Sequence, residues 1–211
     1  QFDGIGSDWR DDIATRTVSD QLRAKAMMWF LTTTSRELRD LVTRALYWFG
    51  RGDPESLFAL TLGSLDISDP YVPERMLAAR YGVAMAENSR VAGHPYKKTV
   101  LPKFARQLYE KMFAPGALHG TTHVLTRDFA HRILGLAGLN ERKLFSSAET
   151  KRFSPPFREG GLREWQEAPT DREELHGRDS PFRMDFENYT LGRLAPSRGN
   201  YDYQDPDYRK M

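Results

Sequence analysis

Apolar residues recur at helical spacing through the middle of the chain. Between residues 35 and 49 they fall at i, i+3, i+4, i+7, i+8 and i+11, on one helix face: Leu38, Leu41, Val42, Ala45, Leu46 and Phe49. Thr34 and Glu37 have capping-box spacing, and Gly50 is expected to help end the helix. Residues 21–31 are apolar over a broader arc. The two segments together predict a helical hairpin.

A second hairpin is predicted from Asp53 onward. This aspartate and Pro54 provide an N-cap and a first-turn proline for an apolar helix. Farther along, Pro73 disfavours helical geometry at the residue before it. We therefore expect residues 69–72 to form a turn and Pro73 to be the first residue of the next helix. That helix is apolar enough to pack between neighbours, whereas Arg80 is expected to reach solvent or a partner.

A third hairpin follows, with one helix that runs to Phe113 and a second over residues 123–139. Pro102 belongs in the first turn of the former, and Thr121 or Thr122 is expected to cap the latter. Three hairpins in series, with almost no strand pattern, predict an all-α fold. We expect an α-solenoid of armadillo/HEAT-like helical hairpins with an irregular C-terminal strap. A compact helical bundle is the competing fold.

The pattern divides the chain into four segments. Residues 1–18 are predicted to be a flexible N-terminal segment, and residues 19–150 the stacked helical hairpins. Residues 151–183 are rich in proline, glycine and charge, which predicts a linker or strap. Residues 184–211 are predicted to be a short docking segment and a polar tail.

Composition narrows the classes of partner. The formal net charge is only +2, so we expect no nucleic-acid partner, because such proteins concentrate basic residues on one face. The absence of cysteine excludes disulfides and thiolate-ligated zinc. No apolar run approaches the length of about 20 residues that spans a bilayer. The chain starts at Gln1 without a signal-peptide pattern, so we expect a cytoplasmic piece of a longer protein.

Histidines are the main candidates for chemistry. His119, His123 and His131 lie in one short stretch together with Asp128. On one helix, Asp128 would lie about 60° from His131 but about 140° from His123, so the three cannot converge on a metal. A metal-dependent hydrolase that uses this neighbourhood is the alternative function. The simpler interpretation is that the histidines form hydrogen bonds to neighbouring helices.

Motifs for other chemistries are missing from the sequence. A phosphate-binding loop would show Gly-x-x-x-x-Gly-Lys before Ser or Thr, and a nucleophile elbow would show Gly-x-Ser-x-Gly. Neither pattern occurs. We therefore expect no catalytic residue, no metal and no cofactor in this chain.

Aromatic residues are the candidates for a protein-binding surface. Trp29 neighbours Phe30, and Tyr47 neighbours Trp48, so one ring of each pair points away from the apolar stripe. Such rings either pack on the next repeat or anchor a protein ligand. Trp165 and Tyr189 are further candidates.

Several segments resemble the helical region downstream of the ATPase module in large bacterial STAND NTPases, the NACHT-like proteins that include the antiviral STAND group. These segments are SRELRDLVTRALYWF, SDPYVPERMLAARYGVAMA, THVLTRDFAHRILGLAG and the later DFENYTLG. The resemblance covers roughly Ser19 to Gly192. Its motif positions, to which the resemblance assigns a structural role, are Asp69, Pro70, Tyr71, Arg127 and Asp128.

The resemblance implies a scaffold or sensor role. Such proteins combine an ATP-dependent oligomerisation switch and an effector domain with a superhelical region that senses a foreign protein, which in the antiviral group is a phage structural or packaging protein. This chain lacks the phosphate-binding loop, so neither ATP binding nor effector activity carries over to it. The implied partners are a protein ligand, possibly from a phage, and the rest of the parent chain. A purely architectural role, spacing the ATPase from a distal sensor, is the remaining alternative.

Overall fold

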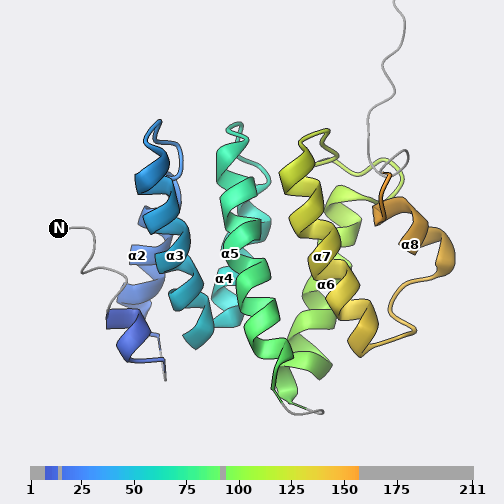
Figure 1. The fold of residues 1–211 in the computed structure, drawn as a ribbon, viewed down its shortest axis with the longest axis horizontal. Helices are drawn as coiled ribbons and strands as arrows, with labels where there is room; N and C mark the ends of the chain where they lie inside the picture. The colour runs from blue at the N-terminus through green and yellow to red at the C-terminus, as the bar shows by residue number, and fades with distance from the viewer. Residues whose placement is uncertain (1–7, 14–15, 91–93, 157–211) are drawn as a thin grey trace, which may run out of the picture. The chain divides into compact units, whose positions relative to one another are not determined.

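The computed structural model describes residues 8–13, 16–90 and 94–156. The chain divides into two units, residues 1–163 and 164–211, and all described residues lie in the first. Every regular element in them is helical. Residues 8–11 are helical, and they are followed by α2 (Val18–Phe30), α3 (Arg36–Gly52), α4 (Pro54–Ser64), α5 (Tyr71–Asn88), the π-helix η1 (Tyr96–Val100), α6 (Leu101–Met112), α7 (Val124–Asn140) and α8 (Ser147–Phe153) (Figure 1). The predicted all-α fold is confirmed for this part of the chain.

The helices pack in consecutive pairs. Helices α2 and α3, α4 and α5, and α6 and α7 contact each other within their pairs, while α5 also packs on α3 and α7. In Figure 1, α3, α5 and α7 lie side by side, with α4 and α6 behind them. This serial arrangement has the pairing that the sequence pattern predicts. Its assignment to the armadillo or HEAT class stays a prediction.

Helix α5 begins two residues earlier than predicted. Its first residue is Tyr71, and Pro73 occupies the third helical position. The first N–H groups of a helix have no intrahelical acceptor, so a proline at this position removes no hydrogen bond. Asp69 favours the early start, because its carboxylate accepts a hydrogen bond of 2.9 Å from the Tyr71 N–H. The expected turn over residues 69–72 is therefore wrong in its second half.

Two predicted caps are also wrong. Helix α3 is capped by Ser35 rather than Thr34: the Ser35 hydroxyl accepts a 3.3 Å hydrogen bond from the Leu38 N–H. Helix α7 is capped by His123, whose Nδ1 accepts a 3.3 Å hydrogen bond from the Thr126 N–H. The Nδ1 atom of His123 therefore accepts the capping hydrogen bond that the hydroxyl of Thr121 or Thr122 was expected to accept.

Gly50 has a packing role instead of ending α3. The helix continues through it to Gly52. A Cβ atom at Gly50 would lie 2.3 Å from Leu57 Cδ2 and 3.0 Å from Val83 Cγ2. Only a residue without a side chain allows α4 and α5 to approach α3 this closely.

The core consists of two hydrophobic clusters that share α4 and α5. Leu77 and Ala84 belong to the cluster formed with η1, α6, α7 and α8. Met76 and Val83 belong to the cluster formed with α2 and α3. Because α5 faces both clusters, its apolar residues surround the helix instead of forming a single stripe.

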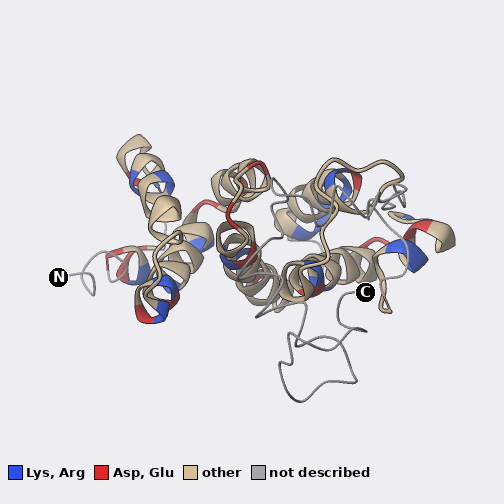
Figure 2. Ribbon diagram, turned by 90° about the horizontal axis from the view of Figure 1, so that it is seen from above, with Lys and Arg blue, Asp and Glu red and all other residues tan. Residues whose placement is uncertain are grey.

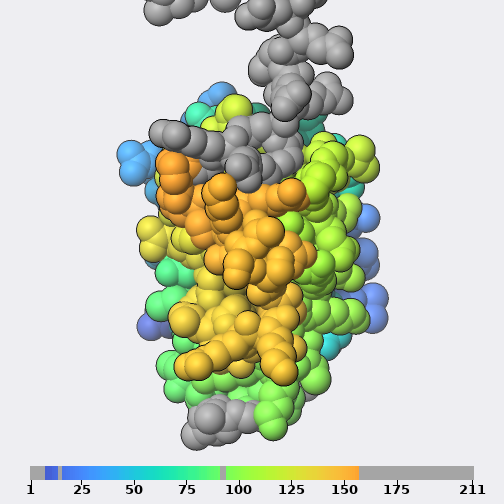
Figure 3. All heavy atoms as spheres, turned by 90° about the vertical axis from the view of Figure 1, so that its right-hand side faces the viewer, coloured from blue at the N-terminus to red at the C-terminus, as the bar shows by residue number. Residues whose placement is uncertain are grey.

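Both ends of the described region contain core residues that periodicity did not indicate. Trp9, within the predicted flexible segment 1–18, is only 3% exposed and packs on Phe49 with ring centroids 5.2 Å apart. At the other end, the unpredicted α8 buries Phe153 among aromatic residues of α6 and its C-terminal end. Figure 3 shows α8, in orange, lying against α6 and α7.

Charges are mixed over the described helices. Figure 2 shows basic and acidic residues interspersed along them, without one continuous basic stripe in the coloured part of the chain. Within the described ranges, no helix combines the length and the apolar composition that crossing a bilayer requires.

Candidate functional site

A cleft of about 600 Å³ lies where several helix ends meet. It is lined by residues at the end of α3, the start of α4, the end of α5 and in η1. The C-terminal ends of α3 and α5 lie at the lower end of these helices in Figure 1. Its polar lining residues are Arg51, Glu55, Glu87, Arg90, His94 and Tyr96. Groups from two consecutive hairpins and from the start of the third therefore share one site.

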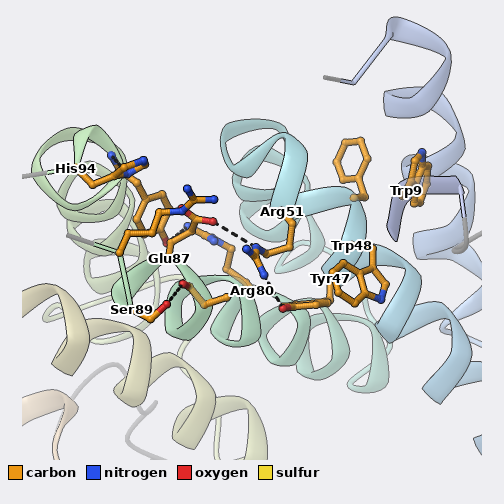
Figure 4. Close-up of polar contacts among 12 residues, drawn as sticks. Trp9, Tyr47, Trp48, Arg51, Arg80, Glu87, Ser89 and His94 are labelled. Atoms are coloured by element: carbon orange, nitrogen blue, oxygen red, sulfur yellow. Dashed lines mark hydrogen bonds and ion pairs between the residues drawn. The ribbon is translucent and has the colours of Figure 1, made fainter. Parts of the chain in front are cut away.

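A buried carboxylate organises the cleft. Glu87 is only 3% exposed, and its two oxygens lie 3.3 Å from Arg51 Nε and 2.6 Å from Arg90 Nε. Arg51 also donates a 3.0 Å hydrogen bond from Nη1 to the Tyr47 hydroxyl. Figure 4 shows this chain of contacts from α3 to the end of α5. Glu87 therefore lies between two guanidinium groups, and Glu55 is the second carboxylate in the lining.

Arg80 lies behind this wall with no exposed surface. Its Nη2 donates a 2.6 Å hydrogen bond to the Tyr96 hydroxyl, and its guanidinium carbon lies 3.2 Å from the centre of the Phe58 ring. The predicted solvent-facing position of Arg80 is therefore wrong. The planar guanidinium can lie inside the core because it stacks on an aromatic face, which a periodicity argument does not consider.

The positive charge of Arg80 has little compensation. No acidic side chain in the described ranges forms an ion pair with it, and its Nε and Nη1 have no hydrogen-bond acceptor there. Burial lowers the pKa of Arg80 to about 10, and the contact with Tyr96 and the more distant charge of Glu87 oppose that shift only in part. The guanidinium nevertheless stays protonated at neutral pH.

Tyr96 connects Arg80 to the cleft. The residue is 3% exposed, it lines the cleft, and its hydroxyl accepts the hydrogen bond from Arg80. Burial raises the pKa of the Tyr96 phenol, so the phenol remains neutral and cannot balance the guanidinium charge. The charge of Arg80 is therefore not neutralised by its hydrogen-bond partner.

The predicted aromatic anchors that the structure describes are Trp29, Tyr47 and Trp48. Tyr47 and Trp48 are half-buried and pack edge to face, with ring centroids 4.8 Å apart. Trp29 is 53% exposed on α2. Of these three described anchors, Tyr47 joins the contacts of the cleft, through Arg51. Trp165 and Tyr189 lie outside the described residues.

The motif residues of the resemblance contact the chain's own helices. Pro70 directly precedes α5, and the Asp69 carboxylate accepts a hydrogen bond from the Tyr71 N–H in the first turn of that helix. The centre of the Tyr71 ring lies 4.2 Å from the Arg39 guanidinium carbon. Arg127 is 2% exposed and donates a 3.0 Å hydrogen bond to the carbonyl before α7. Asp128 pairs with Arg132 at 2.6 Å.

The three histidines have separate surroundings. His119 Nε2 lies 3.2 Å from an Asp66 oxygen, and His123 Nε2 lies 3.6 Å from a Glu74 oxygen. The His131 ring packs near Phe153, at 6.0 Å between centroids. The part of the chain that the structure describes contains no group of three potential metal ligands. His119, His123 and His131 thus each contact a different partner, Asp66, Glu74 and Phe153 respectively.

Sequence reasoning missed the residues that line the cleft. The one local signal is the spacing of Glu87 and Arg90, which is typical of a helical ion pair. Arg51 reaches the pair from 36 positions away along the chain, and this contact depends on how α3 packs on α5.

Comparisons with protein-family models, curated proteins and solved structures find no match to this chain.

Proposed function

We propose that the chain is a non-catalytic helical scaffold that binds a protein ligand, or relays its binding, as part of a cytoplasmic STAND NTPase in antiphage defence. The resemblance in the helical segments supports the family, and the serial packing of helix pairs supports the scaffold role. The cleft at the ends of α3, α5 and η1 is the observation that carries the binding role.

The composition of the cleft favours a protein ligand. Arginine is enriched among the residues that contribute most to protein–protein binding, and the cleft presents Arg51 and Arg90. Apolar side chains from Ile13 and Val100 lie beside them. Such a mixture suits a peptide segment that carries both charged and apolar groups.

The helix contacts offer a route for relay. Helix α5 contributes Glu87 to the cleft and packs directly on α3, α4 and α7. A ligand that displaces the end of α5 therefore acts on both neighbouring hairpins. The rest of the parent chain is the proposed recipient of that displacement.

Co-purification of the tagged chain with individually expressed phage structural and packaging proteins tests this function. We expect one of them to co-purify in fixed stoichiometry. Arg51→Glu should abolish that complex, because it reverses a charge in the cleft. Arg142→Glu, at an exposed position after α7, is the matched control and should preserve it. Failure of every phage protein to bind would contradict the proposal.

A further inference from the structure

We propose that the cleft binds an acidic peptide segment of the protein ligand, with a ligand carboxylate held between Arg51 and Arg90 in front of the buried charge of Arg80. This inference rests on the proposed function and specifies the chemistry of its ligand. It assigns the cleft a carboxylate-binding site.

The first step of the argument is the geometry that Glu87 already shows. Its carboxylate oxygens lie 3.3 Å from Arg51 Nε and 2.6 Å from Arg90 Nε, so two guanidinium groups converge on one carboxylate. Arg90 is partly exposed, with 43% of its side chain accessible. Each guanidinium has further N–H donors than the one that contacts Glu87, and those donors can take a second carboxylate.

The second step is the charge balance around the cleft. Arg51 and Arg90 line it, and Arg80 lies directly behind it. Two lining carboxylates, those of Glu55 and Glu87, oppose these three cations. The excess of one positive charge is the buried charge of Arg80, which one ligand carboxylate can neutralise.

The third step is the position of Arg80. A fully buried charge without a counter-ion is costly, and buried cations are normally paired. Glu87 is the carboxylate whose charge opposes the burial of Arg80, yet it is shared by Arg51 and Arg90. A second carboxylate in the cleft strengthens the negative potential at Arg80, and this interaction acts through a poorly solvated interior. Part of the cost of burying Arg80 is thereby recovered when the ligand binds.

The cleft suits a peptide carboxylate better than a polyanion. Glu55 at its wall repels a highly charged group, and the described helices present no continuous basic stripe along which a phosphate chain could extend. The apolar contribution of Ile13 and Val100 matches the aliphatic parts of a peptide. Short peptides with alternating glutamate and leucine have the required chemistry.

Fluorescence polarisation with a labelled Glu-Leu-Glu-Leu-Glu peptide tests the inference, with the matched Gln-Leu-Gln-Leu-Gln peptide as its control. We expect the glutamate peptide to bind at least about tenfold more tightly, the effect of charge-assisted hydrogen bonds. Equal binding of the two peptides would overturn the carboxylate site. Displacement of the glutamate peptide by an equal concentration of inorganic phosphate would also overturn it, since the site would then accept any anion.

Substitutions in the cleft provide the second readout. Arg90→Gln, at a partly exposed position, should weaken binding of the glutamate peptide about tenfold, and Arg142→Gln should leave it unchanged. Glu87→Gln should strengthen binding, because it frees both arginines from their internal carboxylate. Arg80→Met should weaken binding although the residue cannot touch the ligand. Weaker binding by a folded Glu87→Gln variant, with an unchanged thermal unfolding midpoint, would contradict the proposed geometry.

The two proposals can fail separately. A phage protein that co-purifies with the chain while the glutamate peptide does not bind retains the scaffold function and removes the carboxylate site. Binding of the glutamate peptide without any phage partner would retain the carboxylate site and remove the proposed scaffold function.

Discussion

At the scale of single residues, the unusual feature is a charge in the core. Arg80 is retained by a stack on Phe58 and by one hydrogen bond to Tyr96, without an ion pair in the described ranges. Aromatic stacking stabilises a desolvated guanidinium by about 2 kcal/mol or more. Tyr96 supplies the only acceptor that Arg80 has among these residues, so it controls how well the charge is tolerated.

Tyr96→Phe should lower the free energy of unfolding by about 1–3 kcal/mol, because a buried donor group loses its acceptor. In an Arg80→Met background, the same substitution should cost much less, since no guanidinium then needs the hydroxyl. Urea unfolding of the four proteins in this double-mutant cycle measures the coupling. An equal cost in both backgrounds would mean that the hydroxyl stabilises the fold independently of Arg80.

Asp20 predicts a specific pH dependence. The hydrogen bond of 2.9 Å from the Trp9 indole is the main reason that the pKa of Asp20 is lowered from 3.8 to about 2. The unfolded chain therefore takes up this proton at a higher pH than the folded chain. The contribution of the Asp20 carboxylate to the free energy of unfolding is complete above about pH 4 and is lost as the pH falls toward 2.

Guanidinium chloride unfolding at several pH values between 5 and 2 tests this window. Asp20→Asn should flatten the decline in unfolding free energy over that interval, and Trp9→Phe should have a smaller effect in the same direction. Asp11→Asn removes an exposed carboxylate and serves as the control. A decline that is just as steep in Asp20→Asn as in the unmodified chain would refute the assignment.

At the scale of elements, the sequence predicted the helices better than their ends. Apolar periodicity placed α3 correctly, because amphipathic spacing depends only on which face of a helix is buried. The helix start at Tyr71 and the cap by His123 depend on individual side-chain acceptors, which several neighbouring residues could have supplied. Helix α8 was missed because it is short and has one buried residue, Phe153.

The candidate site was less predictable than the fold. Glu87 and Arg90 are near neighbours in sequence, but Arg51 and Tyr96 join them only through the packing of separate helices. A surface position for Arg80 followed from its charge. Its burial depends on the rings of Phe58 and Tyr96, which periodicity does not bring together.

Two glycines within helices should respond oppositely to alanine. Gly50→Ala should destabilise the fold by about 1–3 kcal/mol, because its Cβ overlaps Leu57 and Val83. Gly135→Ala in α7 meets nothing within 4 Å and should stabilise the fold by up to about 1 kcal/mol through higher helix propensity. Thermal and urea unfolding of both variants measures these two changes in stability. Stabilisation by Gly50→Ala would show that α4 can move away from α3 without loss.

At the scale of the whole described unit, stability is divided between two clusters. Helices α2 and α3 rely on one of them, and η1, α6, α7 and α8 rely on the other, while α4 and α5 take part in both. In stacked helical arrays, each pair of helices depends mainly on its neighbours. A defect should therefore spread first within its own cluster.

Leu46→Ala and Leu134→Ala form a matched pair for this idea. Both leucines are fully buried, one in each cluster, and each substitution should cost about 2–5 kcal/mol. Hydrogen exchange should accelerate most in α2 and α3 for the former and in α6 and α7 for the latter. Identical exchange patterns in both variants would instead indicate one cooperative unit.

The enclosure of α5 has a consequence for how binding preference can change. Its middle faces both clusters, so a substitution there disturbs the packing of its neighbours. Arg90 and His94, which line the cleft, lie just beyond its C-terminal end and belong to neither cluster. Substitutions at these two positions change the charge of the cleft and leave the packing of both clusters intact. Under the proposed function, ligand preference can therefore change at the helix ends while the stack of helices stays the same.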